Sequence, residues 1–297
     1  MLAAMDPTGA GRRHGPAEQV AFSDASAYSG ALETTVISGE LQPGDQLAGY
    51  EIGAVLGRGG MGVVYRAFDA RLGRPVALKL IAPEKAQDER FRTRFLGESQ
   101  LAASLDHSNV VPVYDAGEAD GHLYIAMRYV EGTDLRTLLA RDAPLDPARS
   151  LALVGQVAAA LDAAHARGLV HRDVKPANIL VTEETGREHC YLSDFGLTRG
   201  PDPTGSQSEP AHLSGTVAYT SPEQIAGDLV TAKADVYSLA CVLYECLSGH
   251  PPFAGRRSMA VLVAHVQEPP PTLPAHPALG PVLSRALAKE PSDRYAT

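Results

Sequence analysis

The sequence predicts an α+β protein built as two lobes, with strands early in the chain and long helices later. Strand-like segments are concentrated between residues 50 and 130, whereas the longest apolar helical stripes lie beyond residue 146. With 297 residues the chain exceeds the roughly 100–150 residues of a common single domain, so two lobes or two domains are expected. Hydrophobic residues make up 44% and charged residues 21%, as in ordinary soluble globular proteins.

Charge and cysteine content exclude several classes of protein. The formal net charge of -9 argues against a nucleic-acid-binding protein, which would need a basic face. The three cysteines, Cys190, Cys241 and Cys246, lack the number and spacing of a disulfide framework or a zinc site, which fits a reducing cytoplasm. No apolar run approaches the roughly 18 residues of a membrane span, and no signal peptide is expected.

The first 47 residues predict a disordered N-terminal arm. They are rich in Gly, Ala, Ser, Thr and Pro and show no sustained periodicity. Thr34 and Thr35 lie in this arm and are most simply linker residues.

A glycine-rich hairpin is predicted next. Residues 50–56 and 63–68 have the pattern of two strands around a turn at residues 57–62. The turn has the spacing G-x-G-x-x-G-x-V, formed by Gly57, Gly59, Gly62 and Val64. Glycines let backbone amides approach phosphate oxygens closely. A dinucleotide-binding fingerprint shares this spacing, but here the turn leads into a strand and not a helix.

A lysine and a glutamate follow on apolar elements. Residues 75–81 alternate as a strand that puts Lys79 on one face with Ala77 and Ile81. Residues 88–105 predict a helix whose apolar stripe includes Glu98. An unpaired buried carboxylate is costly, so we expect Glu98 to pair with Lys79. Two alternatives to this pair remain. Lys79 would extend its ammonium group to solvent from an edge strand, or Glu98 would be a solvated helix residue.

The remaining elements are predicted from periodicity and capping residues. Asp146 and Pro147 predict a helix N-terminus and Gly168 its stop. The expected strands are residues 110–114 and 123–130 around a turn at Gly121, then residues 179–181 and 190–192. Residues 234–247 are apolar nearly all round, as in a buried helix.

Residues 171–180 concentrate the functional side chains. Asp173, Lys175 and Asn178 place a carboxylate, an ammonium and an amide within six positions, before an apolar strand. Each alone would be an ordinary turn residue. Asp194 follows a predicted strand and precedes Phe195 and Gly196, and such a carboxylate suits a cation that prefers oxygen ligands.

These motifs resemble those of bacterial eukaryotic-like (Hanks-type) serine/threonine protein kinases, similar to actinobacterial receptor-kinase catalytic domains. Residues 171–178 match H-R-D-x-x-x-x-N, residues 76–79 read V-A-L-K for V-A-I-K, residues 194–196 are D-F-G, and residues 221–223 are S-P-E for A-P-E. The resemblance covers residues 50–294. It implies the bilobal protein-kinase fold, with a small antiparallel β-sheet lobe and one helix over residues 48–131. A larger mainly helical lobe is expected over residues 132–297, truncated at its C-terminal end.

The resemblance implies ATP-dependent phosphoryl transfer to Ser/Thr hydroxyls with Mg²⁺, or Mn²⁺ in its place. Asp173 would orient the acceptor hydroxyl, Lys175 would neutralise the γ-phosphoryl group, and Thr216 would bond to both. Lys79, paired with Glu98, would contact the α and β phosphates. Asn178 and Asp194 would hold the metal ions. The implied nucleotide contacts are Leu56, Gly57, Arg58, Gly59, Gly60, Met61, Gly62, Val63, Val64, Ala77, Lys79, Met127, Arg128, Val130 and Leu180.

The resemblance also assigns an activation segment to residues 200–216. Autophosphorylation is expected there, and the candidate hydroxyls include Thr204, Ser206, Ser208 and Ser214. Arg172 would bind that phosphate through a charge-assisted pair. Asp235 would accept from amides or steady the catalytic loop, and Arg294 would pair with Glu223.

The implied partners are protein substrates, with no nucleic acid and no membrane segment in this chain. Thr34 and Thr35 resemble segments read by phosphothreonine-binding (FHA-type) domains, and an N-lobe homodimer is a further possibility by analogy. The expected location is cytoplasmic, with membrane tethering if a longer natural product exists. Two other functions stay open: a pseudokinase scaffold, which would ordinarily lack a catalytic part, and a small-molecule phosphotransferase, which would lack a full activation segment.

Overall fold

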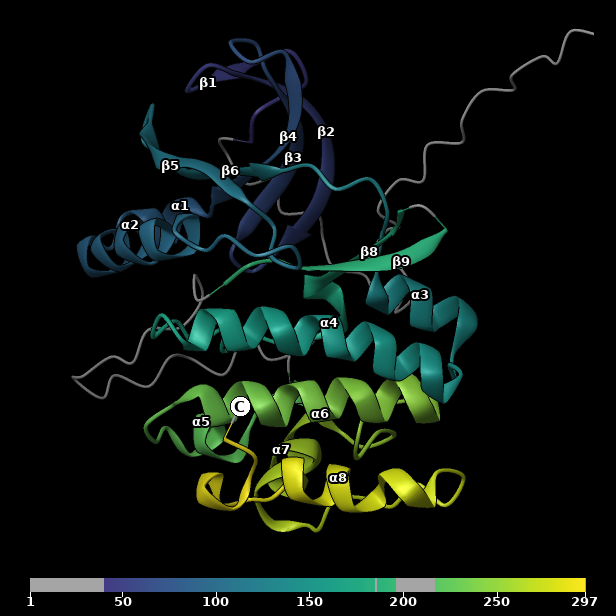
Figure 1. The fold of residues 1–297 in the computed structure, drawn as a ribbon. Helices are drawn as coiled ribbons and strands as arrows, with labels where there is room; N and C mark the ends of the chain where they lie inside the picture. The colour runs from purple at the N-terminus through teal and green to yellow at the C-terminus, as the bar shows by residue number, and fades with distance from the viewer. Residues whose placement is uncertain (1–39, 185, 196–216, 297) are drawn as a thin grey trace, which may run out of the picture.

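The computed structural model describes residues 40–184, 186–195 and 217–296. A sheet lobe stands above a helical lobe, and a small second sheet lies between them (Figure 1). The predictions for Thr34, Thr35, Gly196, residues 200–215 and Thr216 fall outside the described residues. No helix within the described ranges is both long and apolar enough to cross a membrane.

The upper lobe is built on a six-stranded antiparallel sheet in the order β1-β2-β3-β4-β6-β5. Its strands are β1 (Gln46–Leu47), β2 (Tyr50–Gly59), β3 (Gly62–Asp69), β4 (Arg74–Ile81), β5 (Val113–Ala119) and β6 (His122–Arg128). The sheet thus begins inside the range predicted as an arm, and Leu47 is buried in its core. The strand predicted at residues 110–114 starts three residues later, because Val110 instead bridges to Leu192 of the lower lobe.

Both faces of β4 are covered, so the alternation predicted for this strand holds. Val76, Leu78 and Leu80 pack in an outer apolar cluster with β1–β3. Ala77 and Ile81 face an inner cluster that includes Phe95 of α2 (Glu89–Ala103). The short helix α1 (Pro83–Ala86) precedes α2, whose N-terminus is capped by the Asp88 carboxylate.

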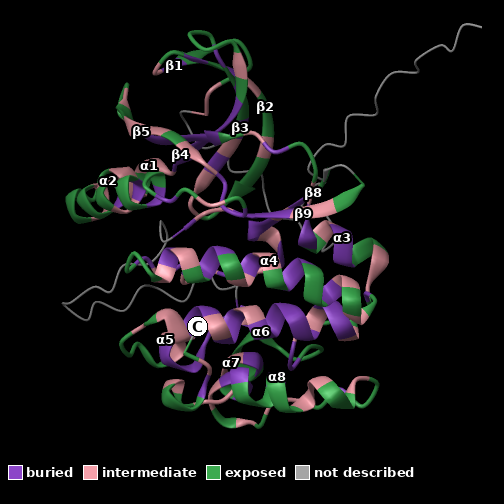
Figure 2. Ribbon diagram, viewed as in Figure 1, coloured by how far each residue is buried: buried purple, intermediate pink, exposed green. Residues whose placement is uncertain are grey.

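The lower lobe is mainly helical. Its helices are α3 (Leu135–Asp142), α4 (Pro147–His165), α5 (Pro222–Ala226), α6 (Ala232–Ser248), α7 (Ser258–Gln267) and α8 (Gly280–Ala286). As predicted, the Asp146 side chain caps α4, although the helix ends three residues before Gly168. The helix α6 is buried over most of its length, as its colouring in Figure 2 shows. The helices α4 and α8 pack against it.

The second sheet and short 3-10 turns carry the loops of the site. The sheet has the order β7-β8-β9, with β7 (Thr133–Asp134), β8 (Ile179–Glu184) and β9 (Arg187–Leu192). The strands β8 and β9 are longer than predicted. The 3-10 turns are η1 (Pro176–Asn178), η3 (Val217–Tyr219), η4 (Pro277–Leu279) and η5 (Pro291–Asp293). The turn η1 lies in the predicted catalytic loop, and η3 begins directly after residue 216.

Candidate active site

The glycine-rich hairpin forms as predicted, with Gly59 of β2 opposite Gly62 of β3. Three glycines of this hairpin are needed for different reasons. A Cβ on Gly62 would lie 1.8 Å from the Leu80 carbonyl oxygen, and its φ of +138° favours glycine, so the fold itself needs this residue. A Cβ on Gly57 or Gly59 would meet nothing within 4 Å. Close approach of a phosphate to the backbone would require glycine at these two positions, whereas folding does not.

Lys79 links the two lobes. Its ammonium group lies 2.8 Å from the Asp194 carboxylate, which follows β9. Lys79 is buried, with only 5% of its surface exposed, so it does not snorkel to solvent. Burial opposes ionisation of Asp194, but the positive charge and hydrogen bond of Lys79, together with the charge of Lys175, outweigh it and lower the pKa of this carboxyl group. Asp194 is therefore ionised at neutral pH and able to hold a cation.

The predicted pairing of Lys79 with Glu98 is not the arrangement in this structure. Glu98 faces Arg172 of the catalytic loop at 4.0 Å, while Lys79 bonds to Asp194. Burial raises the pKa of Glu98, and the charges of Arg172 and Arg94 oppose that rise. The prediction that Glu98 needs a cationic partner was right. The partner depends on the placement of α2 against the lower lobe, which the helical periodicity of the sequence cannot give.

The residues of the predicted catalytic loop are held together by short contacts. The Asp173 carboxylate accepts hydrogen bonds from Lys175 Nζ at 2.9 Å and from Asn178 Nδ2 at 3.2 Å. The same Asn178 amide donates to the Asp173 backbone carbonyl at 2.8 Å. Ser193 donates both its backbone amide and its hydroxyl to the Asn178 carbonyl, at 2.9 and 3.1 Å. Because Ser193 precedes Asp194, these contacts join Asp173 to the residue that binds Lys79.

Asp235 of α6 fixes the backbone of the same loop. Its carboxylate is fully buried and accepts from the amides of His171 and Arg172, each at 2.8 Å. This confirms the expectation that Asp235 accepts from amides and steadies the loop. The φ of Arg172 is +66°, a left-handed conformation that such amide contacts help to hold. His171 donates from Nε2 to the Ser193 carbonyl at 2.8 Å, which links the loop to the segment that carries Asp194.

Two further residues hold this loop and were missed from the sequence. His165, at the end of α4, lies 2.7 Å from the Asp235 carboxylate. Gln224 of α5 donates from its side-chain amide to the Arg172 carbonyl at 2.8 Å. Their partners are 70 and 52 positions away, so no local pattern could reveal them.

The apolar residues predicted to contact the nucleotide gather in one cluster. They come from both lobes and comprise Leu56, Val64, Ala77, Met127, Val130 and Leu180. Ala77, Met127 and Val130 are buried, whereas Leu56, Val64 and Leu180 are partly exposed. A small cavity lined in part by Met127, Asp194 and Phe195 continues from this cluster. A flat apolar base could therefore lie between the partly exposed side chains, next to the Lys79–Asp194 pair.

Other predicted nucleotide residues have contacts of their own. The Val63 side chain packs in the outer cluster, so it does not face the cleft between the lobes. Arg58 is exposed and pairs with Glu40 at 2.7 Å. The Arg128 amide donates to the Pro112 carbonyl at 2.9 Å, so the backbone group that Arg128 could offer to a nucleotide is its carbonyl.

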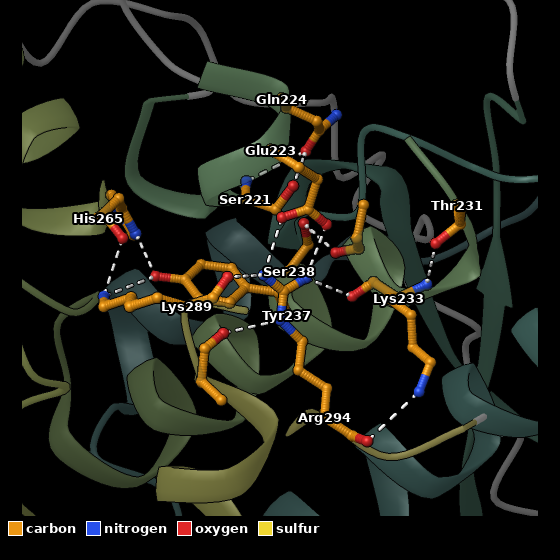
Figure 3. Close-up of polar contacts among 12 residues, drawn as sticks. Ser221, Glu223, Gln224, Thr231, Lys233, Tyr237, Ser238, His265, Lys289 and Arg294 are labelled. Carbon is orange, nitrogen blue, oxygen red and sulfur yellow. Dashed lines mark hydrogen bonds and ion pairs between the residues drawn. The ribbon is translucent and has the colours of Figure 1, made fainter. Parts of the chain in front are cut away.

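A buried ion pair supports the site from below. Arg294 forms two bonds with the Glu223 carboxylate, at 2.6 and 2.8 Å, and also donates to three backbone carbonyls (Figure 3). This confirms the predicted pair. The Arg294 side chain is fully buried, and its multiple bonds satisfy the guanidinium group away from water.

The fold and the site together define a protein kinase. Residues 50–296 match the family model described as "Protein kinase domain", and the chain belongs to this family. The contacts above agree with that assignment, since the motif residues of both lobes meet in one place.

The chain is similar to several mycobacterial proteins. It is 45% identical over 262 residues to "Serine/threonine-protein kinase PknD" of Mycobacterium tuberculosis, which covers 86% of this chain and 39% of that protein. It is 43% identical to PknE of Mycobacterium bovis over 87% of this chain and 46% of that protein. A crystal structure of the M. tuberculosis PknI kinase domain superposes with a TM-score of 0.70 at 38% identity, over 87% of this chain and 94% of that one. The chain thus spans less than half the length of these curated relatives.

Proposed function

We propose that this chain is a serine/threonine protein kinase that transfers the γ-phosphoryl group of ATP to hydroxyl groups of proteins, with Mg²⁺ or Mn²⁺. The observation that carries the proposal is the unbroken set of contacts from Lys79 through Asp194 and Asn178 to Asp173. Phosphoryl transfer asks a protein mainly for positioning and charge neutralisation, and this set supplies both.

The residues present suit ATP and its metal ions. The open backbone at Gly57 and Gly59 has room for phosphate oxygens, and Lys79 is a buried cation beneath that hairpin. Asp194 and Asn178 offer the oxygen ligands that Mg²⁺ prefers. Within the described ranges, no group of three or more His, Cys, Asp or Glu side chains could hold a metal by itself. Oxygen atoms of the nucleotide would therefore complete the coordination.

The side chains have distinct roles in the proposed reaction. ATP supplies the phosphoryl group, and the metal ions neutralise its charge. Asp173 accepts the proton of the acceptor hydroxyl. Lys175, 2.9 Å from Asp173, neutralises charge on the transferred group. A lysine two positions after the catalytic Asp resembles the serine/threonine class and not the tyrosine class, in agreement with the names of the relatives.

Activation in this proposal involves an exchange of ion pairs. Glu98 would leave Arg172 and pair with Lys79, Lys79 would be free to contact the α and β phosphates, and Asp194 would be one of the residues that hold the metal. A phosphate on the activation segment binds Arg172 and so favours the exchange. The support for this step is that Glu98 and Lys79 each already bond to a residue of the lower half of the site.

The proposal is tested with the purified chain, Mg-ATP and a protein substrate, and phosphate is mapped by mass spectrometry. Phosphoserine and phosphothreonine are expected with the wild type. Lys79→Met should lower transfer by about 10³-fold or more while circular dichroism shows a folded protein. A fully active Lys79→Met variant would refute the role of Lys79. Phosphate on a small alcohol and on no protein would favour a small-molecule phosphotransferase. The absence of any phosphate transfer would favour a pseudokinase.

Partners and location follow from the same proposal. Protein substrates with Ser or Thr acceptors would bind beside the catalytic loop in the cytoplasm. Phosphothreonine at Thr34 or Thr35 would recruit an FHA-type domain, and the upper lobe would mediate homodimer formation. Phosphopeptides that contain these threonines, tested for binding to an FHA domain, and sedimentation of the chain would check the two partner proposals.

A further inference from the structure

The segment Val217–Tyr219 forms the turn η3 and directly follows Thr216. The family resemblance implies that the Thr216 hydroxyl would bond to Asp173 and Lys175, on the acceptor side of the site. The position of η3 therefore bears on where a polypeptide substrate lies. Two elements, α6 and α7, contact this turn from beneath.

One side of the turn is bonded to α6. The Tyr219 hydroxyl donates to the Glu245 carboxylate at 2.6 Å, and the Ser238 hydroxyl donates to the Tyr219 carbonyl at 2.7 Å. Burial raises the pKa of Tyr219, and the neighbouring Glu245 charge adds to the rise, so the hydroxyl stays protonated and remains a donor. The Tyr219 end of the turn is thus fixed to the centre of the lower lobe.

The other side of the turn depends on α7. Val217 packs in a small apolar cluster with Phe253, Val261 and Ala264. Val261 and Ala264 belong to α7, a short helix with many exposed residues. Apolar packing alone is non-directional, so the orientation of α7 needs another constraint.

His265 supplies that constraint. Its side chain is fully buried, and its Nδ1 lies within hydrogen-bond distance, 2.8 Å, of the Tyr237 hydroxyl of α6. Lys289 donates to the carbonyls of His265 and Ala264, at 2.8 and 3.4 Å, and so caps the last turn of α7 (Figure 3). The Phe253 ring packs edge-on against the imidazole, with 5.1 Å between ring centroids.

The charge state of the imidazole is set by the same neighbours. Burial lowers the pKa of His265 to about 4, and the Lys289 charge acts in the same direction. Val217 of η3 packs in one apolar cluster with Phe253, whose ring lies against the imidazole, so η3 and His265 share this neighbour. His265 is therefore neutral at pH 7 and stands between α6, the capped end of α7 and η3.

We infer that His265 is a positioning residue for the polypeptide substrate. Through Tyr237 it fixes α7 against Val217–Tyr219, and so it sets the affinity for the protein substrate and not for ATP. This inference rests on the proposed function, since η3 matters to a substrate only if the chain phosphorylates proteins. His265 lies far from Lys79 and Asp194 in sequence. None of the contacts described for that ion pair involves His265.

The test compares His265→Leu, His265→Asn and Leu283→Ala in the full chain. Leu removes the polar contact with Tyr237, whereas Asn keeps a polar atom near the Nδ1 position. Leu283 is a core residue of α8 and serves as a control for loss of stability elsewhere in the lobe. His265→Leu should raise KM for a peptide substrate about tenfold, the loss expected for one buried hydrogen bond, with KM for ATP within about twofold. His265→Asn should recover most of the affinity, and Leu283→Ala should leave KM for the peptide unchanged.

A second readout does not require activity. Hydrogen exchange of the amides of residues 217–220 should be at least about tenfold faster in His265→Leu, with exchange in the middle of α6 unchanged. Equal peptide KM values for His265→Leu and Leu283→Ala, or unchanged exchange in η3, would overturn the inference. If the wild type phosphorylates no protein, the proposed function fails, while the exchange measurement still decides whether His265 positions η3.

Discussion

The lower half of the active site is held by fully buried groups, whereas the upper half combines one buried ion pair with a weaker, partly exposed one. Below, the fully buried Asp235 holds two amides of the catalytic loop, and Arg294 and Glu223 form a buried pair. Above, Lys79 bonds to Asp194, and the nearest pairing of Glu98 is with Arg172 at 4.0 Å. The residues proposed to act on the acceptor hydroxyl are thus already assembled, while those proposed to bind the phosphates still have to change partners.

This difference indicates where regulation can act at little energetic cost. A partly exposed ion pair at 4.0 Å contributes about 1 kcal/mol or less, so Glu98 can leave Arg172 easily. Removing one partner of a buried, multiply bonded pair costs about 3–5 kcal/mol. A movement of α2 is therefore compatible with a stable catalytic loop, and the following predictions test that contrast.

The largest effect is expected for the buried pair below the site. Arg294→Met leaves the Glu223 carboxylate buried without its partner and should lower the free energy of unfolding by about 3–5 kcal/mol. Arg58→Met, which breaks the exposed pair with Glu40, is the matched control and should cost less than about 1 kcal/mol. Urea unfolding followed by circular dichroism measures both. Equal losses would contradict the contrast.

Asp235→Asn should mainly affect the rate of transfer. The amide keeps the shape of the side chain but weakens its bonds to the amides of His171 and Arg172, and we expect kcat to fall about 10²-fold. Asp228→Asn, at an exposed position after α5, should leave kcat unchanged. Steady-state kinetics on protein substrate gives both values. An Asp235→Asn enzyme with wild-type kcat would show that the loop does not depend on this carboxylate.

The buried His265 predicts a specific pH dependence of stability. Its pKa is about 4 in the folded chain and ordinarily 6.5, so between these values the unfolded chain binds more protons. The stability due to neutral His265 is present above pH 6.5 and is lost as the pH falls toward 4, by about 2 kcal/mol between pH 7 and pH 5. His265→Asn should remove this part of the slope in unfolding measured at both pH values. An unchanged slope would contradict a neutral buried imidazole.

The smallest expected effect concerns Glu98. Glu98→Gln should change the free energy of unfolding by less than about 0.5 kcal/mol, because the contact with Arg172 is weak. It should nevertheless lower kcat/KM for ATP about tenfold, since the proposed active pairing with Lys79 is lost. Glu89→Gln, at an exposed position in the first turn of α2, is the control. A large loss of stability together with unchanged activity would reverse the roles assigned to the two contacts.

Local patterns in the sequence were sufficient for much of the fold. The hairpin of β2 and β3, the two faces of β4 and the capped start of α4 each depend on residues close in sequence. The start of β5 was predicted wrongly, because Val110 is buried by a contact with Leu192 and not by a place in the upper sheet. Burial by a loop and burial by a strand give the same apolar pattern.

The pairing of charges required the structure. Periodicity placed Glu98 on the inner face of α2, but its partner depends on how that helix sits against the lower lobe. The contact of Gln224 with the catalytic loop and that of His165 with Asp235, which holds the loop, likewise join residues 52 or more positions apart. The pair of Glu223 and Arg294 was predicted only because the family resemblance supplied a long-range contact.

The most direct test of the central claim separates binding of the nucleotide from transfer of its phosphoryl group. Wild type and Asp173→Asn are compared for binding of Mg-ATP by calorimetry and for phosphorylation of protein serine and threonine residues by mass spectrometry. The account predicts a dissociation constant within about threefold of wild type and transfer lowered at least about 10³-fold. Phosphorylation at the wild-type rate by Asp173→Asn would contradict the proposal that Asp173, Asn178, Asp194 and Lys79 form one phosphotransfer site.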